Sequence, residues 1–189
     1  MTIKMKQILT YPSPILREKI LMVEKVDQTI SAEIEELTKI LIATENTAAG
    51  LAATQIGYKR RFFGLKVGKE NAVEIFINPK VTRTDGKKVY PMIVFDDGKQ
   101  ENFLEGCLSF PDLFGTVKRW LKVEVEWEEI KNDNLVKKKK IMEGFEAIVF
   151  QHEAEHLDGV LFIDHIKEEG GKLYRYEGKK RKLVDVKKI

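Results

Sequence analysis

The sequence predicts an α+β fold, because helical and strand-like signals occupy separate stretches of the chain. Apolar residues recur every three to four positions around residues 32–45 and again after Gly144, whereas the signals between about 60 and 142 are those of strands. The strands do not alternate with helices, so a doubly wound parallel sheet is not expected. We expect antiparallel sheets instead.

The composition is that of a globular protein. The 189 residues suffice for one hydrophobic core, and 43% hydrophobic with 33% charged residues does not resemble a disordered chain. Lys+Arg 33 against Asp+Glu 30 leaves a net charge of +3, which by itself gives no argument for binding nucleic acid. We expect a single domain over residues 1–189, with a basic C-terminal tail from about 167 to 189.

The cysteine and hydropathy patterns indicate a cytoplasmic protein. Cys107 is the only cysteine, so no intramolecular disulfide can form, as is typical of a reducing compartment. No stretch approaches the roughly 18 apolar residues of a membrane span, and no signal peptide is recognisable at the N-terminus. We expect no membrane partner and no DNA partner. An organellar protein whose import segment has been removed is the alternative.

The first helix is expected over about 32–45, with Ser31 as its N-cap. The segment 47–57 that follows consists almost wholly of small residues, which let another backbone approach closely. Strand-like runs then lie at 62–67, 73–77, 89–95, 121–128 and 135–142. The second run is expected to break at Asn78-Pro79, and Asp96-Asp97-Gly98 predicts a turn. Residues 121–128 alternate apolar and charged, so one face should be buried and the other wet.

The period changes near Gly144 and predicts one helix of about twenty residues, to about Ile166. This helix carries His152 and His156, which are four positions apart, so both rings project from one face and can bind one metal ion. Glu153 neighbours the first histidine and can reach a metal-bound water as general base. His165, the third histidine, does not share that face, and we expect it to be structural.

A catalytic metal ion normally takes three protein ligands and keeps one position open. A metzincin-like site would need a histidine at position 162, where this chain has Phe162. A thermolysin-like site would need a glutamate on another helix, and Glu177, at about the right spacing, lies in sequence that is a poor helix former. Cys107 can complete the site as a thiolate, although a lone cysteine is more commonly a small buried hydrophobic residue.

Three segments resemble the signature motifs of the peptide deformylase family, which removes the N-formyl group from newly made bacterial proteins. Residues 105–109 match the family pattern in full, 151–159 match except that Glu155 replaces the usual Asp, and 50–55 match after a variant start at Ala48. Further similar segments extend the resemblance from about residue 7 to 166; they are 11–17, 77–79 and 161–164.

The resemblance implies a metal-dependent amide hydrolase whose antiparallel sheets pack around a central metal-binding helix. It implies that Cys107, His152 and His156 hold one divalent ion. Fe²⁺ is the expected ion, and Zn²⁺, Ni²⁺ or Co²⁺ would also suit this ligand set. The enzyme would remove the formyl group from the N-terminal formyl-methionine of nascent bacterial polypeptides and release formate.

The resemblance also implies catalytic roles for three other residues. Glu153 would accept a proton from the attacking water and later deliver it to the leaving amine. The backbone N–H of Leu108 and the side-chain amide of Gln55 would stabilise the oxyanion that forms at the formyl carbon. A surface or turn-capping glutamine is the alternative interpretation of Gln55.

A formylated N-terminus is an extended chain end, so we expect it to bind by strand addition. Gly50 and Gly106 match the family positions whose backbone contacts the peptide, and both would let it come close. Phe145 and Ile148, one or two helical turns before His152, would line an apolar pocket for methionine. Val149 suits that pocket and the core equally well.

Four positions limit what the resemblance implies. Glu155 is one methylene longer than the usual Asp, and we expect it to support a metal ligand, with a modest loss of activity. Ala48 and Ala49 stand at the mouth of the pocket. Bulkier residues are common at the position of Ala49, so the substrate range could differ.

Arg119 matches a family arginine, and whether it contacts the substrate or forms an ion pair stays open. The segment between Pro79 and Glu105 is longer than in the shortest members by about a hairpin.

Two basic runs stand out, Lys137–Lys140 and the tail cluster at 179–182 and 187–188. The ordinary interpretation is that these residues are solvated surface, and the more specific one is that the tail docks on ribosomal RNA.

Two further alternatives stay open for the whole chain. One is a divergent relative with an altered substrate range or without catalysis, acting as a binding module. The other is a zinc endopeptidase, which would have no need of Cys107.

Overall fold

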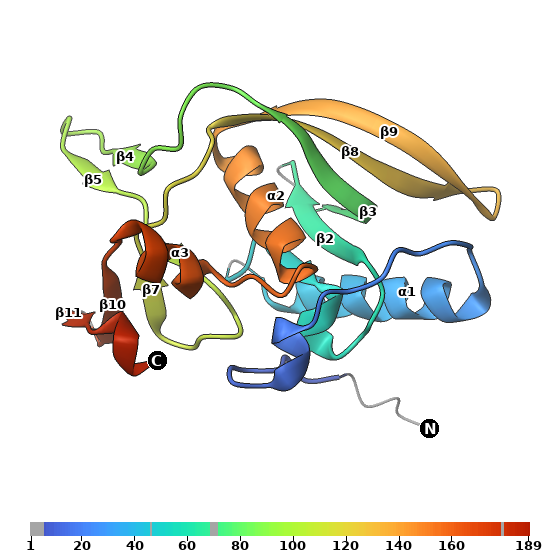
Figure 1. Ribbon diagram of the computed structural model, residues 1–189, viewed down its shortest axis with the longest axis horizontal. Coiled ribbons are helices and arrows are strands. Elements are labelled where there is room, and N and C mark those ends of the chain that lie inside the picture. The colour runs from blue at the N-terminus through green and yellow to red at the C-terminus, as the bar shows by residue number, and fades with distance from the viewer. Residues whose placement is uncertain (1–5, 46, 69–71, 179) are drawn as a thin grey trace.

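The computed structural model describes residues 6–45, 47–68, 72–178 and 180–189 and confirms the α+β class (Figure 1). A five-stranded antiparallel sheet has the order β1-β2-β3-β8-β9. Its strands are β1 (Gly50–Ala52), β2 (Phe62–Val67), β3 (Ala72–Thr84), β8 (Lys122–Lys131) and β9 (Asn134–Glu143). A second sheet has the order β11-β10-β7-β6. Its strands are β6 (Glu105–Gly106), β7 (Leu113–Gly115), β10 (Leu173–Glu177) and β11 (Lys180–Val184).

Two helices cover opposite faces of the five-stranded sheet. Neighbouring residues of a strand point to opposite faces, and Phe62 packs in a cluster with Leu37 and Leu41 of α1 (Gln28–Ala43). Phe63 points the other way and meets Phe150 of α2 (Gly144–His156), with ring centroids 5.2 Å apart. Helix α2 therefore lies in the middle of the molecule, with the second sheet on its other side (Figure 1).

The predicted twenty-residue helix is wrong, because the chain forms two helices, α2 and α3 (Phe162–Glu169). Gly159 has a φ of +72°, which ends helical geometry between them. A Cβ there would lie 2.4 Å from the carbonyl oxygen of Arg17, so the close approach of another backbone also requires glycine. The apolar periodicity runs on into α3 and conceals this break.

Two other predicted boundaries are wrong. Helix α1 begins at Gln28, and its cap is Asp27, whose carboxylate accepts a hydrogen bond from the backbone N–H of Ile30 at 2.8 Å. Strand β3 continues through Asn78-Pro79, where a register shift replaces the expected break. Asn78 has a φ of +51°, and its side chain bonds both backbone groups of Val23 at 2.8 Å, which holds the irregular position in the sheet.

The other strand predictions are confirmed with shifted ends. β8 and β9 pair along their whole length, and the lysines of β9 meet glutamates of β8, as Lys139 does with Glu124 at 2.8 Å. The run at 89–95 yields only the short β4 (Met92–Val94), which pairs with β5 (Gln100–Asn102) across the predicted turn. The C-terminal basic segment is folded where it is described, in β10, β11 and the 3-10 turn Val186–Lys188. Lys179 lies outside the described residues.

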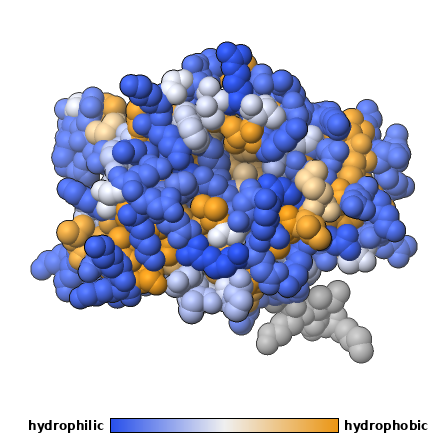
Figure 2. All heavy atoms as spheres, in the orientation of Figure 1, coloured by the Kyte–Doolittle hydropathy of each residue, from blue (hydrophilic) through white to orange (hydrophobic). Residues whose placement is uncertain are grey.

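The surface seen in Figure 2 is mainly hydrophilic, with apolar side chains in separate small patches. No helix in the described ranges is both long enough and apolar enough to cross a bilayer. Two short elements remain, the 3-10 turns η1 (Pro14–Arg17) and η2 (Ala53–Ile56). They flank the region where β1 contacts α2.

Candidate active site

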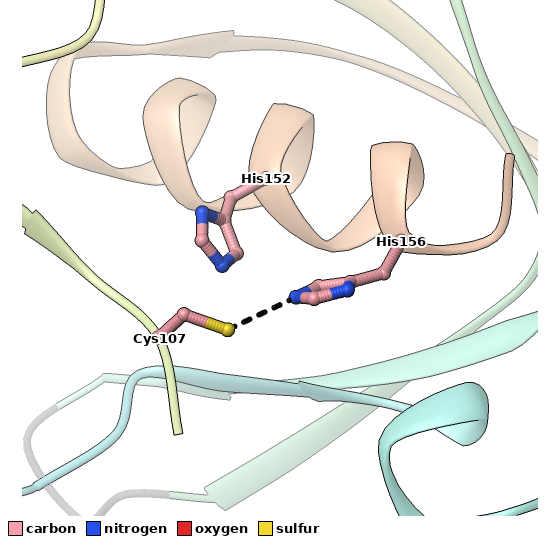
Figure 3. Close-up of side chains that lie close together, drawn as sticks. All are labelled: Cys107, His152 and His156. Atoms are coloured by element: carbon pink, nitrogen blue, oxygen red, sulfur yellow. Dashed lines mark hydrogen bonds between the residues drawn. The ribbon is translucent and has the colours of Figure 1, made fainter. Parts of the chain in front are cut away.

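Three side chains that could hold a metal ion converge beside α2. His152 and His156 project from one side of this helix, and Cys107 follows β6 on the neighbouring segment (Figure 3). Their ligand atoms lie within 4.8 Å of one another, and Sγ of Cys107 is 3.3 Å from Nε2 of His156. The structure therefore brings together the three residues that the sequence singled out.

The chemistry of this cluster suits a divalent metal ion. One thiolate and two imidazoles form a donor set that Zn²⁺ and neighbouring transition metals accept. Both rings are buried, and burial together with the adjacent His152 holds the pKa of His156 well below its usual value. His156 is thus held in the neutral form, in which imidazole binds metals.

Glu153 lies next to this cluster with little contact to solvent. Its side chain is 4% exposed, and its Oε2 has no hydrogen-bond partner among the residues that the structure describes. Burial raises the pKa of Glu153 to about 7, against the opposing effect of His152. The carboxylate therefore has a free oxygen for a substrate or water.

Gln55 in η2 presents its amide to the same place. Its Nε2 lies 3.4 Å from Sγ of Cys107 and donates to Oγ of Ser109 at 3.2 Å. Its Oε1 accepts from the backbone N–H of Ala52 at 2.9 Å, so the NH₂ end is the one that faces the cluster. At 2% exposure Gln55 is not a surface residue.

A cavity of about 470 Å³ opens over these side chains. Its lining includes every predicted site residue except His156 and Glu155, namely Gly50, Gln55, Gly106, Cys107, Leu108, Phe145, Ile148, His152 and Glu153. Ala48, Ala49 and Val149 also line it, and Val149 packs against the core cluster as well.

Three aromatic residues of the cavity, Phe103, Phe110 and Phe114, were not predicted as site residues. The ring of Phe103 meets that of Phe145 edge to face at 5.8 Å. Phe103 follows the β4–β5 hairpin, in the segment expected to be longer than in the shortest family members, and no motif singles it out. Phe145 is 57% exposed, which leaves its ring open to a ligand, whereas Ile148 is buried.

The two glycines of the cavity wall have neighbours that occupy the space of a side chain. A Cβ on Gly106 would lie 2.6 Å from the ring of Phe114. A Cβ on Gly50 would meet the carboxylate side chain of Glu153. A side chain at either position would therefore clash within the protein itself, in addition to blocking the expected close approach of a peptide.

A buried ion-pair network lies behind the metal-binding cluster. Arg119 is 1% exposed, and its guanidinium contacts Glu105 at 2.8 Å and Glu155 at 2.7 Å, so Arg119 forms ion pairs and does not line the cavity. Glu105 in turn lies 3.6 Å from Nδ1 of His152. Burial alone would raise the pKa of Glu105, but Arg119 and His152 lower it to about 2. Such a carboxylate orients a metal-binding imidazole.

Known proteins are similar to this chain over most of its length. The family model described as polypeptide deformylase matches residues 5–172. The peptide deformylase of Thermotoga petrophila is 32% identical over 182 residues and covers 96% of both chains. That of Desulforudis audaxviator is 36% identical over 160 residues, 84% of this chain and 91% of the relative.

Solved structures give the same result. The crystal structure of peptide deformylase from Thermotoga maritima has a TM-score of 0.70 at 32% identity, over 86% of this chain and 97% of that one. A Plasmodium falciparum peptide deformylase in complex with an inhibitor has a TM-score of 0.70 at 29% identity, over 86% and 90%. This chain therefore belongs to the polypeptide deformylase family of metal-binding hydrolases, and its activity is the deformylation of peptides.

Proposed function

We propose that Cys107, His152 and His156 hold one divalent ion, expected to be Fe²⁺, with which this enzyme removes the formyl group from the N-terminal formyl-methionine of new polypeptides. The observation that carries the assignment is the convergence of these three ligand atoms beside a cavity that Cys107 and His152 line. When bound, such an ion polarises a carbonyl oxygen and lowers the pKa of water toward about 7. Zn²⁺, Ni²⁺ or Co²⁺ would substitute for it.

Glu153 moves the proton in this proposal. Its carboxylate lines the cavity and has a free oxygen, so it can take a proton from the attacking water. As the C–N bond of the formamide breaks, Glu153 returns that proton to the leaving amine, and formate is released. General acid–base catalysis of this kind contributes about 10²–10⁴-fold to a rate.

Gln55 and Leu108 supply hydrogen-bond donors for the negative charge that develops on the formyl oxygen. The amide of Gln55 is already oriented by Ala52 and Ser109, so little reorganisation is needed when the charge appears. Leu108 lines the cavity and follows Cys107 directly in the chain. Loss of one such donor typically costs about 2.7–4 kcal/mol of transition-state stabilisation.

The substrate chain is proposed to add to strand β1. This strand pairs with β2 on one side only, because it is the edge of its sheet, and Gly50 lies in the cavity wall. Gly106 lines the same cavity. Phe145 and Ile148 would contact the methionine side chain, and the small Ala48 and Ala49 would leave the mouth open to a wider range of substrates.

Glu155 is proposed to support the metal site without binding the ion. It lies outside the cavity lining, and both of its carboxylate oxygens are 2.7 Å from Nη1 of Arg119. The extra methylene therefore leaves the charge contact to Arg119 intact. We expect an active enzyme with this residue in place of Asp.

The C-terminal segment 167–189 is proposed to dock on the ribosome, in the cytoplasm where nascent chains emerge, with residues 1–189 acting as one catalytic domain. Three of its described basic residues, Lys180, Arg181 and Lys182, lie on β11, the outer strand of the second sheet. Arg181 and Lys182 each pair with one glutamate, as lysines of β9 do with glutamates of β8. Binding to ribosomes should weaken steeply with salt, and binding independent of salt would contradict the proposal.

Formate release tests the catalytic assignment. The protein is reconstituted anaerobically with Fe²⁺ and assayed on an N-formyl-Met tripeptide. The variant is Glu153→Ala, and the matched control is Glu146→Ala, at a half-buried position of the same helix that does not line the cavity. We expect Glu153→Ala to lower the rate of formate release at least about 10²-fold and Glu146→Ala to leave it unchanged. Equal rates for wild type and Glu153→Ala would contradict the role of Glu153.

Two further outcomes separate the alternatives. No formate release by the folded, metal-loaded wild type would favour a binding module, and cleavage of internal peptide bonds would favour an endopeptidase. No observation favours either. The ring of Phe162 lies 6.2 Å from that of His152 but has no atom that could bind a metal ion, and Glu177 does not line the cavity. Phe162 packs in the core around α3, and Glu177 ends strand β10.

A further inference from the structure

The third histidine of the chain, His165, lies at the outer end of a line of charged side chains that begins at the metal-binding cluster. We infer that His165 is a positioning residue, which holds the metal ligand His152 in place through Glu155, Arg119 and Glu105. This inference rests on the proposal that His152 binds the ion.

The inner end of the line is the contact between Glu105 and His152. Oε2 of Glu105 lies 3.6 Å from Nδ1 of His152. Both side chains are buried, so solvent does not compete for this contact. The direction of the Glu105 carboxylate therefore influences the orientation of the imidazole.

Arg119 fixes that carboxylate from the other side. Its Nε and Nη2 donate to Glu105 at 2.9 and 3.0 Å, and its Nη1 donates to both oxygens of Glu155 at 2.7 Å. The guanidinium is planar and rigid, so one arginine that contacts two carboxylates also fixes their positions relative to each other. A shift of Glu155 is thus transmitted to Glu105.

His165 is the group on α3 that contacts Glu155. Its Nε2 lies 3.0 Å from Oε2 of Glu155, and its Nδ1 lies 3.5 Å from Oε1 of Glu169. Glu169 also pairs with Lys88 at 3.1 Å, which anchors the outer end of the line. Contact with Glu155 raises the pKa of His165, which favours the charged ring that attracts a carboxylate.

Without His165, the carboxylate of Glu155 keeps Arg119 as its partner but loses the contact that fixes it from α3. Glu155 ends in a longer side chain than the Asp usual at this position, so it has one more bond about which to rotate. We therefore expect the loss of His165 to loosen the whole line and weaken metal binding, although His165 contacts neither the ion site nor the cavity.

Cobalt binding tests this inference without relying on activity. Co²⁺ affinity is measured by competition with a chelator, and the visible absorption of the Co²⁺ form reports the ligand geometry. His165→Leu removes the contact, His165→Gln keeps an N–H near the position of Nε2, and Arg17→Leu removes an ion pair of the neighbouring Asp164 on the same helix. We expect His165→Leu to weaken Co²⁺ binding about 10-fold and to shift the absorption band.

The matched variants make the result specific. His165→Gln should restore most of the affinity, and Arg17→Leu should leave affinity and spectrum unchanged. Wild-type affinity and an unchanged spectrum in His165→Leu would overturn the inference, as would equal losses in His165→Leu and Arg17→Leu. If His165→Leu does not fold, His165→Asn, which is too short to reach Glu155, provides the same comparison. A Cys107→Ala protein that binds Co²⁺ like the wild type would instead refute the proposed ligand set.

Discussion

A β-carbon on Gly50 would lie 2.7 Å from both Cγ and Oε1 of Glu153 and 2.8 Å from Cδ2 of Leu65. Real Cβ atoms essentially never come this close to other heavy atoms. The bare backbone of β1 therefore forms the wall against which the Glu153 side chain lies. The conformation of the proposed proton carrier depends on a residue in a strand about a hundred positions away in the sequence.

Gly50→Ala is predicted to displace Glu153. The added methyl group must push the carboxylate or β1 aside, which typically costs about 1–3 kcal/mol in an already packed site. We expect a lower free energy of unfolding in urea and at least about a tenfold lower rate of formate release, since a misplaced general base loses part of its 10²–10⁴-fold contribution. Repeating the urea measurement in a Glu153→Ala background identifies the cause, because two of the three close contacts are then absent. An equal cost in both backgrounds would contradict the explanation.

Arg119→Met is predicted to be strongly destabilising. The substitution preserves much of the side-chain volume but leaves the carboxylates of Glu105 and Glu155 without their buried partner. Breaking a buried pair in this way costs about 3–5 kcal/mol. Urea denaturation measures the loss, and Arg17→Met, at the more exposed pair with Asp164, should cost about 1 kcal/mol or less. Similar losses in the two proteins would show that the network is not buried as described.

Asn78→Ala is predicted to destabilise the protein through two separate effects. It removes both side-chain hydrogen bonds to the backbone of Val23, and it places alanine at a φ of +51°. Leaving a buried backbone group unpaired costs about 1–3 kcal/mol. Asn78→Gly also loses the hydrogen bonds but tolerates the backbone conformation, so its melting temperature should fall between those of Asn78→Ala and the wild type. A wild-type melting temperature for Asn78→Ala would refute this account.

The stability of the protein is predicted to depend on the charge of His165. Contact with Glu155 raises the folded-state pKa of His165 above its ordinary value of 6.5, although burial, Arg119 and Lys88 oppose this shift. A raised folded pKa means that the stabilisation is fully present below pH 6.5 and is lost as the pH rises through the folded-state value. The wild type should therefore lose stability relative to His165→Gln as the pH rises from 6 toward 9. Urea unfolding of both proteins across this range measures the difference, and a constant difference would show that the two groups are not coupled.

The site could be predicted from the sequence to the extent that its chemistry is local. His152, Glu153 and His156 lie within one helical turn, so the spacing alone places them on one helix and within reach of one ion. Cys107 was predictable because a metal site needs a third ligand, the chain offers one cysteine, and residues 105–109 match a family motif. Glu105 escaped notice because its role depends on Arg119, and only the folded chain brings these two residues together.

The fold was predictable by class and less so at its boundaries. Period-two alternation identified β8 correctly, but periodicity carries no information on a single residue that changes backbone direction. Gly159 divides one periodic segment into two helices, and Asn78 lets β3 continue where a proline suggested an end. In both places a contact with the chain near residues 17–23 decides the outcome, and such contacts are not visible in a local pattern.

The charge network around Arg119 also constrains how this protein can diverge. If Arg119 or either of its two acids is replaced alone, an unpaired charge is left in the interior. Substitutions at these three positions must therefore occur together. The length of the acid at position 155 is much freer than its charge, since both oxygens of Glu155 still reach Arg119. Substitution of Glu for the usual Asp is then a near-neutral step, and among related chains an acid is expected at positions 105 and 155 wherever the arginine is retained.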